Sequence, residues 1–64
     1  MDFVYVFTVD RAEWEDLVIY LSLEEAIAKS KKHPKVRLDI YKKTEDGYRP
    51  SYRYYLNGEL VDAF

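Results

Sequence analysis

Three segments of the chain have the hydrophobic pattern of β-strands. Phe3–Val9 consists mostly of β-branched and aromatic residues, as expected of a central strand that is buried on both faces. Leu17–Leu21 is a second apolar run, and the polar loop before it predicts an antiparallel hairpin with the first. Val36–Tyr41 alternates between apolar and polar residues, which predicts a half-buried third strand.

The polar loop sets the expected register of the first hairpin. Centring the loop pairs Phe7 with Ile19 and Tyr5 with Leu21. Side chains alternate between the two faces of a sheet, so one face is expected to carry Phe3, Tyr5, Phe7, Val9, Leu17, Ile19 and Leu21. The other face is expected to carry Val4, Val6, Thr8, Val18 and Tyr20.

A single helix is predicted between the second and third strands. Ser22 and Glu25 form a capping box, so the helix begins at Leu23. It is expected to run to His33, because Pro34 cannot continue it. Its apolar positions form one narrow stripe: Leu23, Ala26, Ile27 and Ser30.

A fourth strand is expected after Gly47, and the turn around this residue decides how it pairs with the third. A two-residue Asp46-Gly47 loop places Arg53 opposite Ile40, which is expected to be buried, so we prefer a three-residue Glu45-Asp46-Gly47 loop with a G1 bulge. That register gives these pairs: Ile40 with Tyr52, Leu38 with Tyr54 and Val36 with Leu56 on the core face, and Asp39 with Arg53 and Arg37 with Tyr55 on the other. Pro50 then lies opposite Lys42 and requires an edge or a bulge, because it has no N–H to donate.

Together these elements predict one α+β domain over residues 1–64. The order is ββαββ, in an antiparallel sheet ordered 2-1-3-4 with the helix packed on one face. Asn57-Gly58 is a strong hairpin motif, so Glu59–Asp62 is expected to fold back as a short fifth strand.

One helix covers only one face of such a sheet, and the other face is expected to be an interface. It presents an apolar strip edged by Tyr and Arg: Val4, Val6, Thr8, Val18, Tyr20, Arg37, Asp39, Tyr41, Arg53 and Tyr55. The partner we expect is a second copy, paired about a two-fold axis through this face or through an exposed strand edge. The alternatives are that the alternation slips, that the faces are reversed, or that neighbouring side chains screen the first strand.

Composition is consistent with a binding role. A chain of 64 residues with no Cys has a thin core and no disulfide or thiolate metal site to reinforce it, which leaves oligomerisation. No apolar run is long enough to span a membrane, and no basic segment precedes the first one, so we expect an intracellular protein. Charge is uneven: residues 1–28 carry one Arg and seven acids, whereas residues 29–53 carry nine bases and three acids.

The sequence shows no catalytic motif, metal-ligand spacing or cofactor site, and we expect no enzyme. The loop acids Asp10, Glu13, Glu15 and Asp16 match no EF-hand spacing, and His33 at a helix end complements the helix dipole. Trp14 either folds over the end of the core, which we prefer, or is an exposed anchor for a partner.

Single-stranded nucleic-acid binding is the alternative function. Tyr48–Tyr55 interleaves aromatic and basic residues, and the cations concerned are Lys42, Lys43, Arg49 and Arg53. The negative net charge, the lack of an RNP motif and the expected burial of half of these tyrosines favour protein binding instead.

Several segments together resemble short uncharacterised proteins encoded by large DNA viruses. They are the opening Val4-Tyr5-Val6 strand, the acidic loop with Trp14, Ser22–Ile27, and Tyr54–Glu59, so the resemblance covers nearly the whole chain. These motifs are structural and carry over no site residues. The resemblance implies a protein that acts inside an infected cell or is packaged in a particle, where it binds a host or viral protein.

Overall fold

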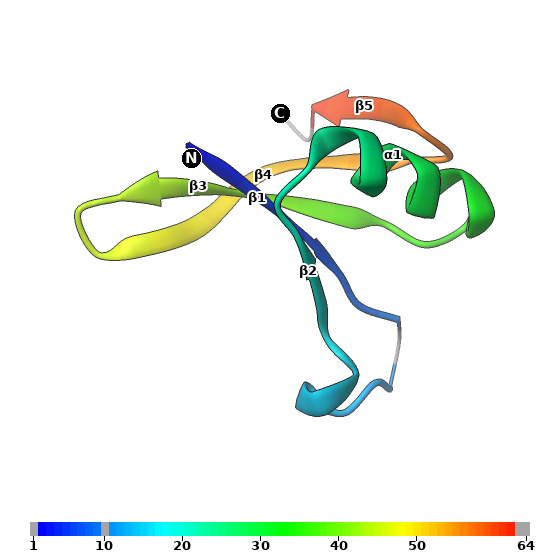
Figure 1. Ribbon diagram of the computed structural model, residues 1–64, viewed down its shortest axis with the longest axis horizontal. Coiled ribbons are helices and arrows are strands. Elements are labelled where there is room, and N and C mark those ends of the chain that lie inside the picture. The colour runs from blue at the N-terminus through cyan, green and yellow to red at the C-terminus, as the bar shows by residue number, and fades with distance from the viewer. Residues whose placement is uncertain (1, 10, 63–64) are drawn as a thin grey trace.

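A five-stranded antiparallel sheet with one helix on one face forms the molecule, in a computed structural model that describes residues 2–9 and 11–62 (Figure 1). The elements are β1 (Phe3–Phe7), a 3₁₀ turn η1 (Trp14–Asp16), β2 (Val18–Tyr20), α1 (Leu23–Lys32), β3 (Leu38–Thr44), β4 (Gly47–Leu56) and β5 (Glu59–Asp62). The strand order is β2-β1-β3-β4-β5. The predicted α+β class, the 2-1-3-4 order and the fifth strand are therefore confirmed.

The core lies between α1 and the strands in the middle of the sheet. Ala26 from the helix packs with Phe7 and Leu38, which are neighbours on β1 and β3. Tyr5 and Tyr55 border this cluster, with ring centroids 6.3 Å apart. Because these paired positions face the helix, we call this side of the sheet the helix face and the opposite side the open face.

The helix ends follow local chemistry. The Ser22 hydroxyl accepts a hydrogen bond from the Glu25 N–H at 3.4 Å, as predicted for the N-cap, and the helix ends one residue earlier than predicted, with His33 as its C-cap. Ser30 is fully buried and accepts a hydrogen bond from the Gly58 N–H at 2.9 Å. This bond ties the β4–β5 turn to the helix. In that turn Asn57 and Gly58 both have positive φ, as a type I′ turn requires.

The predicted register of the first hairpin is wrong by one residue. Tyr5 pairs with Tyr20, and Phe7 pairs with Val18. Glu13 and Asp16 cap the 3₁₀ turn reciprocally, and Leu17 closes it by donating its N–H to the Trp14 carbonyl, so β2 begins one residue later than expected. A shift of one residue moves every side chain to the opposite face, so Val18 and Tyr20 lie on the helix face.

The predicted pairing of β3 with β4 is wrong at both ends of the hairpin. Thr44 pairs with Gly47, so the loop is Glu45-Asp46, which neither expected turn allowed for. The Thr44 hydroxyl accepts from the Asp46 N–H and donates to the Gly47 carbonyl, which closes this tighter turn. Gly47 has a φ of +99°, a conformation that glycine adopts readily.

A bulge then moves the register in the opposite direction. Tyr41 pairs with Pro50 but Ile40 pairs with Arg53, so Ser51 and Tyr52 have no opposite residue on β3. The Ser51 hydroxyl replaces part of the ladder: it donates to the Ile40 carbonyl at 2.7 Å and accepts from the Arg53 N–H at 3.3 Å. The prediction that Pro50 requires an edge or a bulge is confirmed by this bulge, but Pro50 lies opposite Tyr41 and not opposite Lys42 as predicted.

The bulge changes which side chains of β4 face the helix. Leu38 lies opposite Tyr55 and Asp39 opposite Tyr54, so the two tyrosines exchange the faces that we predicted for them. Arg53 lies opposite Ile40 on the helix face, as the rejected Asp46-Gly47 loop implied.

Candidate functional site

Exposed apolar side chains are concentrated on the first hairpin. Among the described residues, ten large hydrophobic side chains are exposed, and seven of them lie between Val9 and Leu23. We call residues 11–21 the apolar arm; its loop projects away from the helix (Figure 1). Leu17, Ile19 and Leu21 are 41%, 53% and 56% exposed. This is a surface of the kind that marks an interaction site.

Strand β2 is also an edge of the sheet. It pairs with β1 on one side only, and its residues, Val18 to Tyr20, carry no charge. The other edge strand, β5, has a carboxylate at each end, Glu59 and Asp62. Charged residues on an edge discourage pairing with another chain, and β2 lacks that protection.

Trp14 is 84% exposed, so the prediction that it folds over the core is wrong. The Glu13–Asp16 capping box, in which the Glu13 N–H donates to an Asp16 carboxylate oxygen at 3.1 Å, holds it in the 3₁₀ turn instead. Its role as an anchor for a partner stays a prediction.

The predicted interface residues do not share one face. Val18, Tyr20, Arg53 and Tyr55 lie on the helix face because of the two register changes, and Thr8 is exposed beyond the end of β1. Val4, Val6, Arg37 and Tyr41 lie on the open face.

Even on the open face, β1 offers little surface. Val4 and Val6 are only 8% and 7% exposed. Their neighbours in the sheet are Tyr41 beside Val4, and Ile19 and Asp39 beside Val6. The strand is thus screened by its neighbours, which is one of the alternatives we raised.

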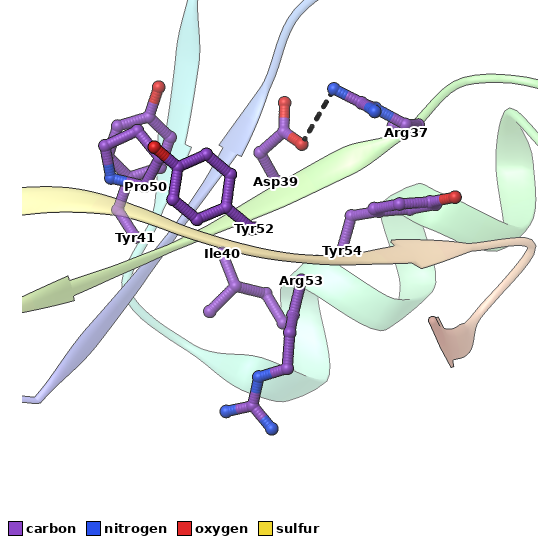
Figure 2. Close-up of a pocket in the computed structure, with 8 residues that line it drawn as sticks. All are labelled: Arg37, Asp39, Ile40, Tyr41, Pro50, Tyr52, Arg53 and Tyr54. Atoms are coloured by element: carbon purple, nitrogen blue, oxygen red, sulfur yellow. Dashed lines mark ion pairs between the residues drawn. The ribbon is translucent and has the colours of Figure 1, made fainter. Parts of the chain in front are cut away.

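A hollow of about 240 Å³ lies on the open face over the β4 bulge (Figure 2). Its main walls are the side chains of Arg37, Asp39, Tyr41, Pro50, Tyr52 and Tyr54, all on one side of the sheet, whereas Ile40 and Arg53 point to the other side (Figure 2). Arg37 binds Asp39 at 3.4 Å, and its guanidinium lies 4.8 Å from the ring centroid of Tyr54. The predicted Asp39–Arg53 and Arg37–Tyr55 contacts are wrong for the same reason of register.

Tyr52 occupies an unusual position in this hollow. Its φ is +66°, in the left-handed region that bulky residues rarely adopt, and it is 66% exposed. The sequence concealed this residue, since alternation alone assigns it to the core. Pro50-Ser51 is the feature that could have revealed the bulge, because a proline cannot donate to the ladder and a serine can replace a backbone partner.

The four cations of the predicted nucleic-acid site are also divided between the faces. Lys42 pairs with Arg49, at positions that share the face of Phe3, and Arg49 binds Asp46 at 3.3 Å. Lys43 lies opposite Tyr48 on the open face. Only this one of the four shares a face with the tyrosines of the hollow.

One described residue, Tyr5, has a shifted pKa. Burial, and secondarily the nearby Tyr55, raise the pKa of Tyr5 above its usual value of 10.0. Among the described residues, no group of three or more His, Cys, Asp or Glu side chains could hold a metal ion. Asp10 of the acidic loop lies outside the described residues.

Comparison of the chain with protein-family models, curated proteins and solved structures gives no significant match. The resemblance to proteins of large DNA viruses therefore stays a prediction, as does an intracellular location. In the part of the chain that the structure describes, no helix has the length and apolar character needed to cross a membrane.

Proposed function

We propose that this protein is a non-catalytic protein-interaction module that forms a homodimer through the edge of β2. The observation that carries the proposal is the uncharged strand Val18–Tyr20 at the open edge of the sheet, flanked by exposed Leu17 and Leu21. Unpaired N–H and C=O groups on such an edge bind another strand, and apolar side chains beside them exclude water from the new hydrogen bonds.

A second copy is the partner that this edge suits best. Two β2 strands can pair antiparallel about a two-fold axis at Ile19, so that Val18 of one copy lies beside Tyr20 of the second. An isologous pair of this kind closes on itself, whereas head-to-tail association of copies gives rings or open filaments. It also reinforces a core that is thin for a chain of 64 residues.

Charge opposes this dimer weakly. In the antiparallel pairing the acidic loop of one copy, with Glu13, Glu15 and Asp16, lies toward the start of α1 of the second copy, which carries Glu24 and Glu25, so the two copies repel each other. Salt screens exposed charges but leaves apolar contacts in place. The dimer should therefore become stronger, not weaker, as the ionic strength rises.

Replacing Ile19 with lysine tests the proposal. Ile19→Lys places a charge on the free edge, and the monomer tolerates it because Ile19 is 53% exposed. Leu60→Lys is the matched control, since Leu60 is 52% exposed on the other edge strand. Light scattering on a sizing column, at several protein concentrations, measures the mass of each variant.

We expect the wild type and Leu60→Lys to approach twice the monomer mass, and Ile19→Lys to dimerise at least tenfold more weakly, a change of about 1.4 kcal/mol. A wild type that stays monomeric at every concentration, or a dimer broken only by Leu60→Lys, contradicts the proposal. Circular dichroism confirms that each variant is folded.

A further inference from the structure

We propose that the open face of β3 and β4 binds single-stranded nucleic acid, at a site separate from the β2 edge. Four tyrosines share this face, and we call them the tyrosine face: Tyr41, Tyr48, Tyr52 and Tyr54. Three of them follow β4 at alternate or bulged positions, and Tyr41 lies opposite Pro50 between them. The inference does not depend on the proposed dimer.

Aromatic rings in a row on a sheet are suited to stacking with bases. Every base has a π-face, so stacking binds single strands with little dependence on sequence. Tyr52, at 66% exposure, offers the most accessible ring, and Tyr54 lies beside it across the hollow (Figure 2). The guanidinium of Arg37 lies 4.8 Å from the Tyr54 ring centroid, which places this cation beside the stacking surface.

The left-handed conformation of Tyr52 supports a functional role. A bulky residue with positive φ is strained, and such strain is concentrated at binding sites. The bulge that contains it is fixed by Ser51, which bonds to the backbone on both sides of the irregularity. Bulges commonly redirect a side chain next to a functional site.

The charge of this region favours a polyanion. Residues 37–53 contain five basic and three acidic residues, but Lys42, Arg49 and Arg53 lie on the helix face, so the cations of the tyrosine face are Arg37 and Lys43. Two of the three acids, Asp39 and Asp46, are already paired with arginines. On the tyrosine face, Arg37 immediately precedes β3 and Lys43 lies near the end of this strand, so the two cations can contact phosphates on either side of stacked bases.

The structure removes two objections to nucleic-acid binding that the sequence raised: the expected burial of the β4 tyrosines and the negative net charge. Half of the four β4 tyrosines were expected in the core. In the structure only one of those four, Tyr55, faces the helix. Most of the acids counted in residues 1–28 belong to the apolar arm and the start of the helix, and the loop of the arm projects in a different direction from the β3–β4 turn (Figure 1).

Fluorescence anisotropy with labelled oligo(dT) and oligo(U), each of roughly 12 nucleotides, tests the inference, because known site sizes are about 4–16 nucleotides. Tyr52→Asn removes the ring and keeps a residue that tolerates positive φ, whereas Tyr52→Phe keeps the ring. Trp14→Ala is the matched control, since it removes an exposed ring from the apolar arm.

We expect the wild type to bind either strand, or both, more tightly than duplex DNA of the same length. Tyr52→Asn should weaken binding about tenfold, in line with the loss of one stacked base, while Tyr52→Phe and Trp14→Ala stay within about twofold of the wild type. Arg37→Gln should reduce the slope of log affinity against log salt by about 0.7, as expected for one lost phosphate contact.

Three results would overturn the inference. One is no binding by the folded wild type at low salt, and another is equal binding by the wild type and Tyr52→Asn. The third is a preference for a proline-rich peptide, which also docks on tyrosine-lined grooves, over both oligonucleotides. A comparison of the DNA and RNA arms shows which strand is the ligand.

Discussion

The two long hairpins of this protein expose apolar surface in different ways. The β1–β2 hairpin exposes it along a strand edge, where Leu17, Ile19 and Leu21 accompany unpaired backbone groups. The β3–β4 hairpin exposes it as rings on a face, beside a bulge and two cations. Backbone groups at an edge bind another strand, whereas rings on a face bind flat groups, so the two hairpins are suited to different partners.

The two hairpins meet at Leu38, so truncating this side chain should destabilise both of them. Leu38 is fully buried and lies opposite Phe7 on β1 and Tyr55 on β4. Leu38→Ala should lower the free energy of unfolding by about 2–5 kcal/mol, because it removes buried methyl groups and leaves a cavity. Urea denaturation measures the change, and a loss below about 1 kcal/mol contradicts the assignment of the core.

A substitution at Ser51 should affect the β3–β4 hairpin and leave the β1–β2 hairpin unchanged. Ser51→Ala removes the hydroxyl that bonds to the Ile40 carbonyl and the Arg53 N–H, so the free energy of unfolding should fall by about 1–3 kcal/mol. NMR chemical shifts should change around the bulge and remain constant in the apolar arm, and dimerisation should be unaffected. Shift changes that extend through β2 would show that the two surfaces are coupled.

The pH dependence of stability gives the smallest effect and tests the contact between β1 and β4. The pKa of Tyr5 is raised in the folded state, so as the pH rises past about 10 the unfolded chain loses this proton first. The free energy of unfolding therefore falls as the pH rises toward the raised value, and below pH 10 Tyr5 contributes no slope.

Tyr5→Phe should reduce that alkaline loss, because the variant has no proton to release at this position. Denaturant unfolding between about pH 9 and pH 11 measures the slopes of both proteins. Identical slopes would contradict the burial of the Tyr5 phenol against Tyr55.

The sequence predicted the architecture because periodicity and capping act locally. The alternation of Val36–Tyr41, the Ser22 cap and the Asn57-Gly58 turn indicated the element types, and the apolar residues on both faces of Phe3–Val9 indicated the central strand of the order. The register of strand pairing depends instead on side-chain hydrogen bonds, which the alternation of apolar and polar residues does not predict. Asp16 and Ser51 supply side-chain bonds that compete with the ladder, and each shifts its hairpin.

The candidate surfaces were predicted only in part for the same reason. The open face was correctly assigned to Arg37 and Tyr41, but Ile19 and Tyr52, which are 53% and 66% exposed, were assigned to the core. A shift of one residue exchanges the faces of a strand, so a small error in a turn changes the whole surface.

Amide hydrogen exchange at several protein concentrations is the decisive experiment for association through the β2 edge. Amides in Val18–Tyr20 that point away from β1 should exchange more slowly as the concentration rises, because pairing with a second copy gives them partners. Those in Glu59–Asp62 should exchange at a constant rate. Protection that is independent of concentration at Val18–Tyr20, or that rises at Glu59–Asp62 instead, would show that the copies do not associate through β2.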